Sequence, residues 1–222
     1  AAFGNSDDNG DGKSANSGSL VFSDASIACL PVRSVYGTFA WVTSPMVLMR
    51  MKRDIDATGV MQEAPNIQDI ISVSDEKIYV CNDSVIKDSE NEVGKKVYLE
   101  DLDLTVDTVN HADNWACLIA QAVFGSQDDW KAEFKKRFCI VADDVFSFLC
   151  QTATQIDARI RIKPQTKSVA SGALWYEESL PVETILYGTV WCDKVYTSEN
   201  NKPTMDLLDK YCKSDLYLQM GG

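Results

Sequence analysis

The sequence contains a single histidine and no pair of cysteines at the CxxC spacing of common zinc sites. Its seven cysteines, at positions 29, 81, 117, 139, 150, 192 and 212, are odd in number. These absences argue against a zinc site and against a disulfide framework. We therefore expect no metal held by cysteine or histidine, and buried free thiols in a reducing cytoplasm.

Long apolar runs are also missing from the chain. No stretch reaches the roughly 18 apolar residues that cross a bilayer, and no charged segment followed by an apolar one marks a signal peptide. The sequence therefore predicts a cytoplasmic protein with no membrane partner. With 222 residues, of which 45% are hydrophobic, the chain can still bury a sizeable core.

Positive charge is scarce, because 21 lysines and arginines face 33 acids and give a net charge of −12. Such a balance argues against a protein covered in nucleic acid. More than half of the excess lies between Asp75 and Asp113, where eleven acids and four lysines give a local charge of −7. The rest of the chain approaches balance and contains cationic clusters, so the net charge does not exclude an RNA partner.

The sequence does contain an unusual apolar stretch, SIACLPVRSVYGTFAWVTSP at residues 26–45, whose only charge is Arg33. A helix with two marked ends follows it. Ser44 can cap this helix, Pro45 suits its first turn, and Gly59 ends it.

The middle of the chain, residues 60–125, has the pattern of a variable acidic and helical insertion with strand fragments before residue 113. A buried helix is predicted at NWACLIAQAVFG, and an amphipathic one at SQDDWKAEFKKRF, where Ser126 and Asp129 fit a capping box. Further on, CIVADDVFSFLCQTAT predicts a short strand and then a helix capped by Asp143.

The clearest strand pattern is IDARIRIK at residues 156–163. Its apolar residues are Ile156, Ala158, Ile160 and Ile162, and they alternate with Asp157, Arg159, Arg161 and Lys163. The alternation predicts a half-buried strand with a largely cationic outer face. We expect ILYGTVWC, at residues 185–192, to be its partner. The 22 residues between them, 163–184, are too many for a simple turn and predict a functional loop.

Several stretches together resemble one family. They are GSLVFSDA, LPVRSVYGTFAWVTSP with RMKRD behind it, VADDVFSFL, ARIRI, GALWYEESLP and the terminal LQMGG. They resemble the repeated backbone subunit of type III-B CRISPR effector complexes, the Cmr effectors, which belongs to the RAMP proteins. The resemblance implies an α+β fold with a modified ferredoxin-like (RRM-like) core, helical insertions and a β-hairpin called the thumb. We expect one such domain over residues 1–222, with the thumb loop at 163–184.

The resemblance also implies a function in antiviral defence. Such subunits form a helical filament on a CRISPR guide RNA, together with copies of themselves and other Cmr subunits. The thumb displaces one base of the guide–target duplex at regular intervals, and the subunit can cut the single-stranded target RNA with Mg²⁺ or another divalent metal. The family's main catalytic aspartate lies before residue 1. The resemblance thus implies a fragment truncated at both ends, without the family's N-terminal strand and helix.

Candidate residues near the apolar stretch follow from the same resemblance. Arg33 and Ser34 are expected to contact the guide backbone, while the alternative for Arg33 is a structural ion pair with one of the many acids. Thr43 and Ser44 can offer a phosphate the N–H groups of a helix N-terminus. Simple capping explains Ser44 equally well.

The remaining candidates belong to the cationic strand and the loop after it. Arg159, Arg161 and Lys163 present charges about 6–7 Å apart along one face, a spacing that suits a nucleotide backbone. Leu174 and Trp175 are candidates for an apolar wedge that unstacks a base step. The resemblance implies a catalytic role for Glu177, in the motif YEE, whereas a surface acid that supports the thumb is the alternative.

Three functions remain open from the sequence. The first is an RNA-guided endoribonuclease subunit, and the second is an architectural RNA-binding subunit that does not cut. The third, which ignores the resemblance, is an acidic α+β protein that binds other proteins through residues 75–113.

Overall fold

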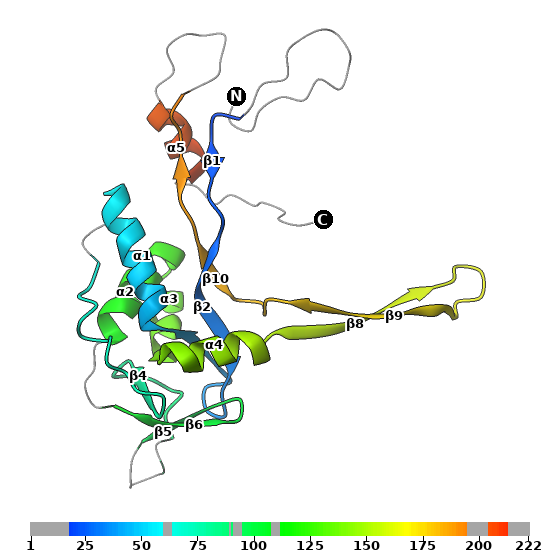
Figure 1. Cartoon of the computed structure of the whole chain (residues 1–222), viewed down its shortest axis with the longest axis horizontal. Coiled ribbons are helices and arrows are strands. Elements are labelled where there is room, and N and C mark those ends of the chain that lie inside the picture. The colour runs from blue at the N-terminus through cyan, green and yellow to red at the C-terminus, as the bar shows by residue number, and fades with distance from the viewer. Residues whose placement is uncertain are drawn as a thin grey trace. The chain divides into compact units, whose positions relative to one another are not determined.

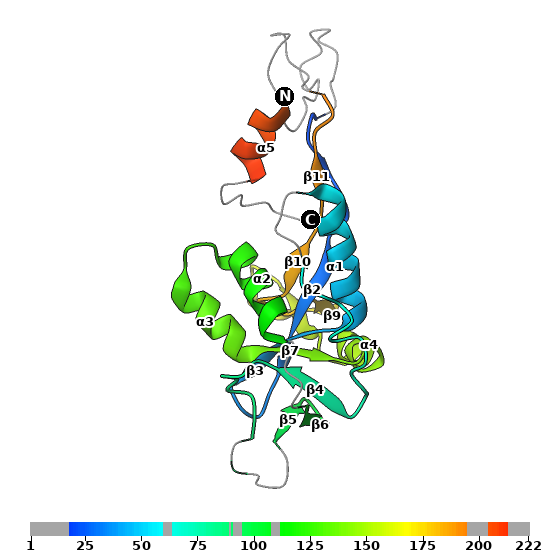
Figure 2. The same ribbon diagram turned by 90° about the vertical axis from the view of Figure 1, so that its left-hand side faces the viewer.

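The computed structural model describes residues 18–59, 64–88, 90, 95–107, 112–194 and 204–212. The chain divides into two compact units, of which the larger runs from Ile27 to Leu186. The smaller unit combines the two ends of the chain, residues 1–26 and 187–222. Figure 1 labels most of the elements of both units, and Figure 2 labels β3, β7 and β11.

A seven-stranded sheet forms the larger unit, in the order β10-β2-β3-β7-β4-β6-β5. Its strands are β2 (Ser26–Arg33), β3 (Phe39–Thr43), β4 (Lys77–Val80), β5 (Lys96–Leu99), β6 (Leu102–Val106), β7 (Phe138–Val141) and β10 (Ile185–Tyr187). The sheet is mixed, because β3 is parallel to β7 and β4 to β6, while β2–β3, β4–β7 and β5–β6 are antiparallel. The α+β class predicted from the sequence is confirmed.

Helices cover both faces of this sheet (Figure 2). On one face, Phe146 and Leu149 of α4 (Asp143–Thr152) join a cluster of buried strand residues such as Val42 and Val141. On the other face, Phe134 of α3 (Asp128–Arg137) packs against Trp41 and Phe138, with ring centroids 5.0 and 5.4 Å away. Successive residues of a strand point to opposite faces, so the central strands β3 and β7 contribute to both apolar layers.

Helix α1 (Pro45–Thr58) has the ends that the sequence predicted. The Ser44 hydroxyl accepts a hydrogen bond from Val47 N–H, Pro45 occupies the first turn, and Gly59 ends the helix in a left-handed conformation. Asp143 was expected to cap α4, and that prediction is wrong. Its carboxylate instead accepts from Met46 N–H at 2.8 Å, so it caps α1, which follows the neighbouring parallel strand.

Residues 60–125, expected to be an insertion, contribute three strands of the main sheet and α2 (Ala112–Phe124). The predicted burial of α2 is confirmed, since Trp115, Ala116 and Ile119 are buried. The capping box at Ser126 is wrong: residue 127 is the N-cap of α3, and no side chain bonds to the free N–H groups there.

The cationic strand has a different partner from the one that we predicted. Strand β8 (Gln155–Ile162) pairs with β9 (Val169–Ser179) in an antiparallel hairpin, so residues 163–184 supply a turn and the second strand. The partner predicted at 185–192 is divided between β10, in the main sheet, and β11 (Val190–Trp191). The half-buried character was also wrong, because no residue of β8 is buried.

The smaller unit holds a second two-stranded pairing. Strand β1 (Val21–Phe22) pairs antiparallel with β11, and Ser23 N–H donates to the Thr189 carbonyl at 2.9 Å. Helix α5 (Thr204–Cys212) belongs to the same unit, and the terminal LQMGG lies outside the described residues. No helix in the described part of the chain is long and apolar enough to cross a membrane.

Candidate nucleic-acid interface

The β8–β9 hairpin is a bare two-stranded ribbon (Figure 1). Because residues directly opposite in an antiparallel pair share a face, the register assigns each side chain to one side. One face carries the pairs Ile156↔Glu178, Ala158↔Tyr176, Ile160↔Leu174 and Ile162↔Val169. The other carries Asp157↔Glu177 and Arg159↔Trp175. The hairpin thus has an apolar face and a charged face, and both are exposed.

Cations gather toward the tip of this ribbon. Arg159, Arg161, Lys163 and Lys167 lie between positions 158 and 176, a span without a single acid. Arg159 pairs with Glu177, whereas no ion pair involves Arg161 or Lys163 among the residues described. A surface with uncompensated positive charge in a chain of net charge −12 favours a phosphate backbone as its partner.

Glu177, the predicted catalytic residue, lies on the charged face and is held by two donors. Its Oε2 accepts from Arg159 Nε at 2.9 Å, and its Oε1 accepts from the Trp175 indole N–H at 2.9 Å. The Trp175 hydrogen bond, with a further contribution from Arg159, lowers the pKa of this carboxyl below its ordinary value. Glu177 is therefore ionised at neutral pH and already bonded within the hairpin.

The two wedge candidates point in opposite directions. Leu174 shares the apolar face with Ile160, whereas Trp175 lies on the charged face opposite Arg159. Both side chains are exposed. Adjacent residues of a strand point to opposite faces, so only one of the two candidates can enter a given base step from one side of the hairpin.

Arg33 lies at the end of β2, where a tight turn leads into β3. Its side chain is 85% exposed and its Nε lies 3.4 Å from Glu100 Oε1. The ion pair that we considered as the alternative is thus present, between Arg33 and Glu100. The Arg33 side chain is exposed and is not a buried, unpaired cation. Next to it, the Ser34 hydroxyl is buried without a hydrogen-bond partner in the described structure.

The turn itself is strained. Gly37 and Thr38 both have positive φ, 72° and 73°, and Phe39 N–H donates to the Gly37 carbonyl two residues back at 2.9 Å. Positive φ is unusual for a β-branched residue such as Thr38. Arg137 stabilises the turn by donating to the Gly37 carbonyl at 3.1 Å, so Arg33 and Ser34 are presented by a fixed backbone.

Thr43 and Ser44 do not lie on this surface. They are 0% and 1% exposed, and the Ser44 hydroxyl caps α1. The helix N-terminus that we expected to meet a phosphate already receives the Asp143 carboxylate. A phosphate therefore has no access to these two side chains in the structure.

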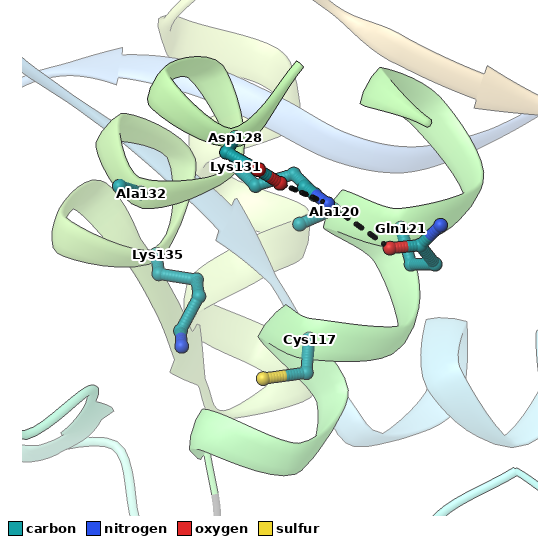
Figure 3. A pocket seen from close by; sticks show the side chains of 7 residues that line it. All are labelled: Cys117, Ala120, Gln121, Asp128, Lys131, Ala132 and Lys135. Carbon is teal, nitrogen blue, oxygen red and sulfur yellow. Dashed lines mark hydrogen bonds and ion pairs between the residues drawn. The ribbon is translucent and has the colours of Figure 1, made fainter. Parts of the chain in front are cut away.

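A groove of about 330 Å³ lies between α2 and α3 (Figure 3). Lys131 is held there by Asp128, at 2.6 Å, and donates to Gln121 at 3.2 Å. Cys117 is exposed at the groove, which corrects the expected burial of every thiol, although Cys29 and Cys139 are buried and free. Cys117 also raises the pKa of Lys135.

Among the residues that the structure describes, no three His, Cys, Asp and Glu side chains form a group that could hold a metal ion. At the base of the hairpin, each acid has a donor of its own. Gln155 donates to Asp157 at 3.0 Å, and Thr154 donates to Glu178 at 2.8 Å. These carboxylates do not fit a divalent ion as they stand.

Comparisons with known proteins agree with this architecture. The chain is 34% identical over 207 residues to the "CRISPR system Cmr endoribonuclease Cmr4" of Pyrococcus furiosus, and the match covers 92% of the chain and 65% of that relative. The chain thus spans slightly less than two thirds of its relative's length.

Solved structures are similar as well. The crystal structure of oligomeric Cmr4 from Pyrococcus furiosus matches with a TM-score of 0.63 and 27% identity, over 92% of this chain and 68% of that one. A cryo-EM structure of the type III-B Cmr-beta complex bound to cognate target RNA matches with a TM-score of 0.56 over 84% of this chain and 61% of that chain. At 17% identity, the second match shows the fold alone.

The model of the RAMP superfamily matches residues 1–222, the whole length of the sequence. Together with the mixed sheet, this match identifies the family. The chain belongs to the RAMP superfamily.

Proposed function

We propose that this chain is a backbone subunit of a type III-B CRISPR effector complex in the cytoplasm. It binds the guide RNA, assembles with copies of itself and with other Cmr subunits, and presents the guide to complementary single-stranded target RNA in antiviral defence. The exposed hairpin carries the proposal, because it gathers four cations over a span without acids. The likeness to a Cmr4 protein supports it.

In this proposal, phosphate contacts hold the RNA without reading its sequence. Arg161 and Lys163 meet phosphates along the hairpin, since neither is engaged by an acid in the described structure. Arg33 makes a further contact from the β2–β3 turn, exchanging Glu100 for a phosphate with the same planar fork. The Ser34 hydroxyl is buried beside it, so in this proposal Arg33 makes the contact without Ser34.

The salt dependence of guide-RNA binding tests these contacts. Arg161→Glu should weaken binding uniformly across guide sequences and reduce the slope of log K against log salt by about one. Arg50→Glu, at an exposed position of α1, makes the same charge change away from the hairpin and serves as the control. Equal losses of guide-RNA affinity in Arg161→Glu and Arg50→Glu would show that only the net charge of the chain matters, and would contradict the proposed RNA-binding surface.

Target cleavage with Mg²⁺ or another divalent metal is the activity that we propose for the whole subunit, following the name of its relative. A second candidate is an architectural subunit that binds RNA and does not cut, and it is favoured by Glu177, whose two carboxylate oxygens already accept hydrogen bonds from Arg159 and Trp175.

Reconstitution separates these two candidates. A complex made with the full-length subunit, a guide RNA and labelled target RNA is incubated with Mg²⁺ and then with EDTA. Metal-dependent cuts at regular intervals would support the endoribonuclease. Tight guide and target binding without cuts would support the architectural subunit, and absence of RNA binding would overturn both.

A further inference from the structure

Trp175 has an unusual environment for an exposed aromatic side chain. It is 41% exposed on a ribbon that no other element covers, so a large part of its ring is open to solvent. Its indole N–H nevertheless donates a 2.9 Å hydrogen bond to Glu177 Oε1, two residues along the same face. An exposed ring that would otherwise rotate freely is therefore held in one orientation.

The acceptor is itself fixed. Glu177 Oε2 accepts from Arg159 Nε at 2.9 Å, and Arg159 lies directly opposite Trp175 in the hairpin register. One carboxylate thus ties the ring to the neighbouring strand, with one donor on each oxygen. These three residues, the Trp175–Glu177–Arg159 chain, cross both strands.

A fixed, exposed aromatic ring beside an arginine is a surface on which a nucleobase stacks. Stacking needs an open π-face and gains from an orientation that is set before binding, because less conformational entropy is then lost. Trp175 combines an exposed side chain with an orientation fixed by a hydrogen bond. Leu174, on the opposite face, offers neither a π-system nor a polar neighbour of this kind.

We propose that Trp175 is a stacking platform for one unpaired RNA base, and that Glu177 is the positioning residue that holds it. The proposal rests on the proposed function, since the hairpin must first meet RNA. It assigns Glu177 a role other than metal ligand or catalyst: its two oxygens hold the donors of Trp175 and Arg159.

The experiment uses a complex reconstituted with the full-length subunit, a guide RNA and a target RNA that carries 2-aminopurine at single positions. Stacking on an indole quenches the fluorescence of this base. Trp175→Ala should restore fluorescence at the base that the hairpin displaces and weaken target binding about five- to 100-fold. Trp130→Ala, at an exposed tryptophan of α3, should change neither quantity.

The role of Glu177 is tested by four further variants. Trp175→Phe keeps a ring but loses the donor, and Glu177→Ala loses the acceptor, so both should reduce quenching in part. The double variant should lose no more than the greater of the two, because both break one link. Glu177→Gln keeps an amide oxygen that can accept from the indole, so its quenching should be stronger than that of Glu177→Ala and close to that of the wild type.

The outcomes separate this inference from the proposed function. A wild-type complex that fails to hold guide and target overturns the proposed function and the platform with it. A wild-type complex that binds RNA, with quenching unchanged in Trp175→Ala, overturns the platform alone. If Glu177→Ala and Glu177→Gln both lower kcat while quenching and target affinity remain those of the wild type, Glu177 is catalytic and the positioning role is wrong.

Discussion

The main sheet and the β8–β9 hairpin are built from similar strand sequences but differ in burial, because the strands of the sheet are covered and those of the hairpin are exposed. In β3, residues alternate between two layers, and both layers are covered by helices. In β8, isoleucines alternate with charged residues just as regularly, yet neither face is covered. Alternation therefore reports the pleat of a strand, and burial depends on what packs against it.

This difference separates stability from binding. The sheet contains large buried side chains, such as Trp41 and Phe138. The hairpin contributes little apolar burial and exposes arginine, lysine, tryptophan and isoleucine to a partner. Substitutions in the two regions should consequently affect different measurements.

A pair of tryptophan substitutions gives the sharpest contrast. Trp41→Ala should destabilise the fold by about 3–5 kcal/mol, since it removes a buried ring packed against Phe39 and Phe134 and leaves the Glu183 carbonyl without its donor. Trp175→Ala should change the free energy of unfolding by at most about 0.5 kcal/mol. Thermal and urea unfolding of both variants checks this, and equal losses would show that the hairpin contributes to the core.

Two glycines with nearly the same φ give the next largest difference. At Gly37, with φ 72°, a Cβ would lie 3.0 Å from methyl groups of Ile86 and Val85, so Gly37→Ala should cost about 2–3 kcal/mol. At Gly172, with φ 70°, a Cβ meets nothing within 4 Å. Gly172→Ala should cost only about 1 kcal/mol, confined to the hairpin and visible in hydrogen exchange of β8 and β9.

A smaller effect is expected at the N-terminus of α1. Asp143→Ala removes the carboxylate that accepts from Met46 N–H and should lower stability by about 1 kcal/mol. Asp144→Ala, one residue on and exposed, is the matched control and should have a smaller effect. If the two substitutions cost the same in urea unfolding, the hydrogen bond from α1 to Asp143 of α4 would contribute nothing.

The smallest effect on stability belongs to the Glu177 carboxylate. Because its pKa is lowered in the folded chain, its contribution is present above the ordinary carboxyl range and disappears as pH falls through the lowered value. Global unfolding should not register this, since the pair is exposed and screened by solvent. The indole N–H resonance of Trp175, assigned by its loss in Trp175→Phe, should shift only in acid. A shift between pH 5 and 8 would contradict the assignment.

Sequence reasoning succeeded where the determinants are local. Ser44, Pro45 and Gly59 lie next to the helix that they delimit, and that helix was predicted correctly. It failed where the partner is distant. Asp143 looked like a cap for its own helix because nothing local reveals that β7 runs beside β3.

The candidate site shows the same limit. The cationic alternation of 156–163 was evident, while its partner strand was misplaced, because 185–192 has a similar apolar composition. The register that puts Arg159 opposite Trp175, and both beside Glu177, required the structure. The opposite orientations of Leu174 and Trp175 could have been predicted, since adjacent residues in any strand alternate.

The order of strands in the main sheet has a consequence for how the chain folds. Trp41 of β3 pairs with Phe138 of β7, so the centre of the sheet closes a long loop of chain, whereas Gln155 and Ser179 pair across a short one. Strand pairs that are close in the sequence form within microseconds. Pairs that are distant in the sequence form more slowly, because closing a long loop costs more chain entropy. During synthesis on the ribosome, the core around β2 and β3 therefore cannot close until β7 has been made. The hairpin follows β7 in the sequence, so the central strands of the sheet are complete before the hairpin is synthesised.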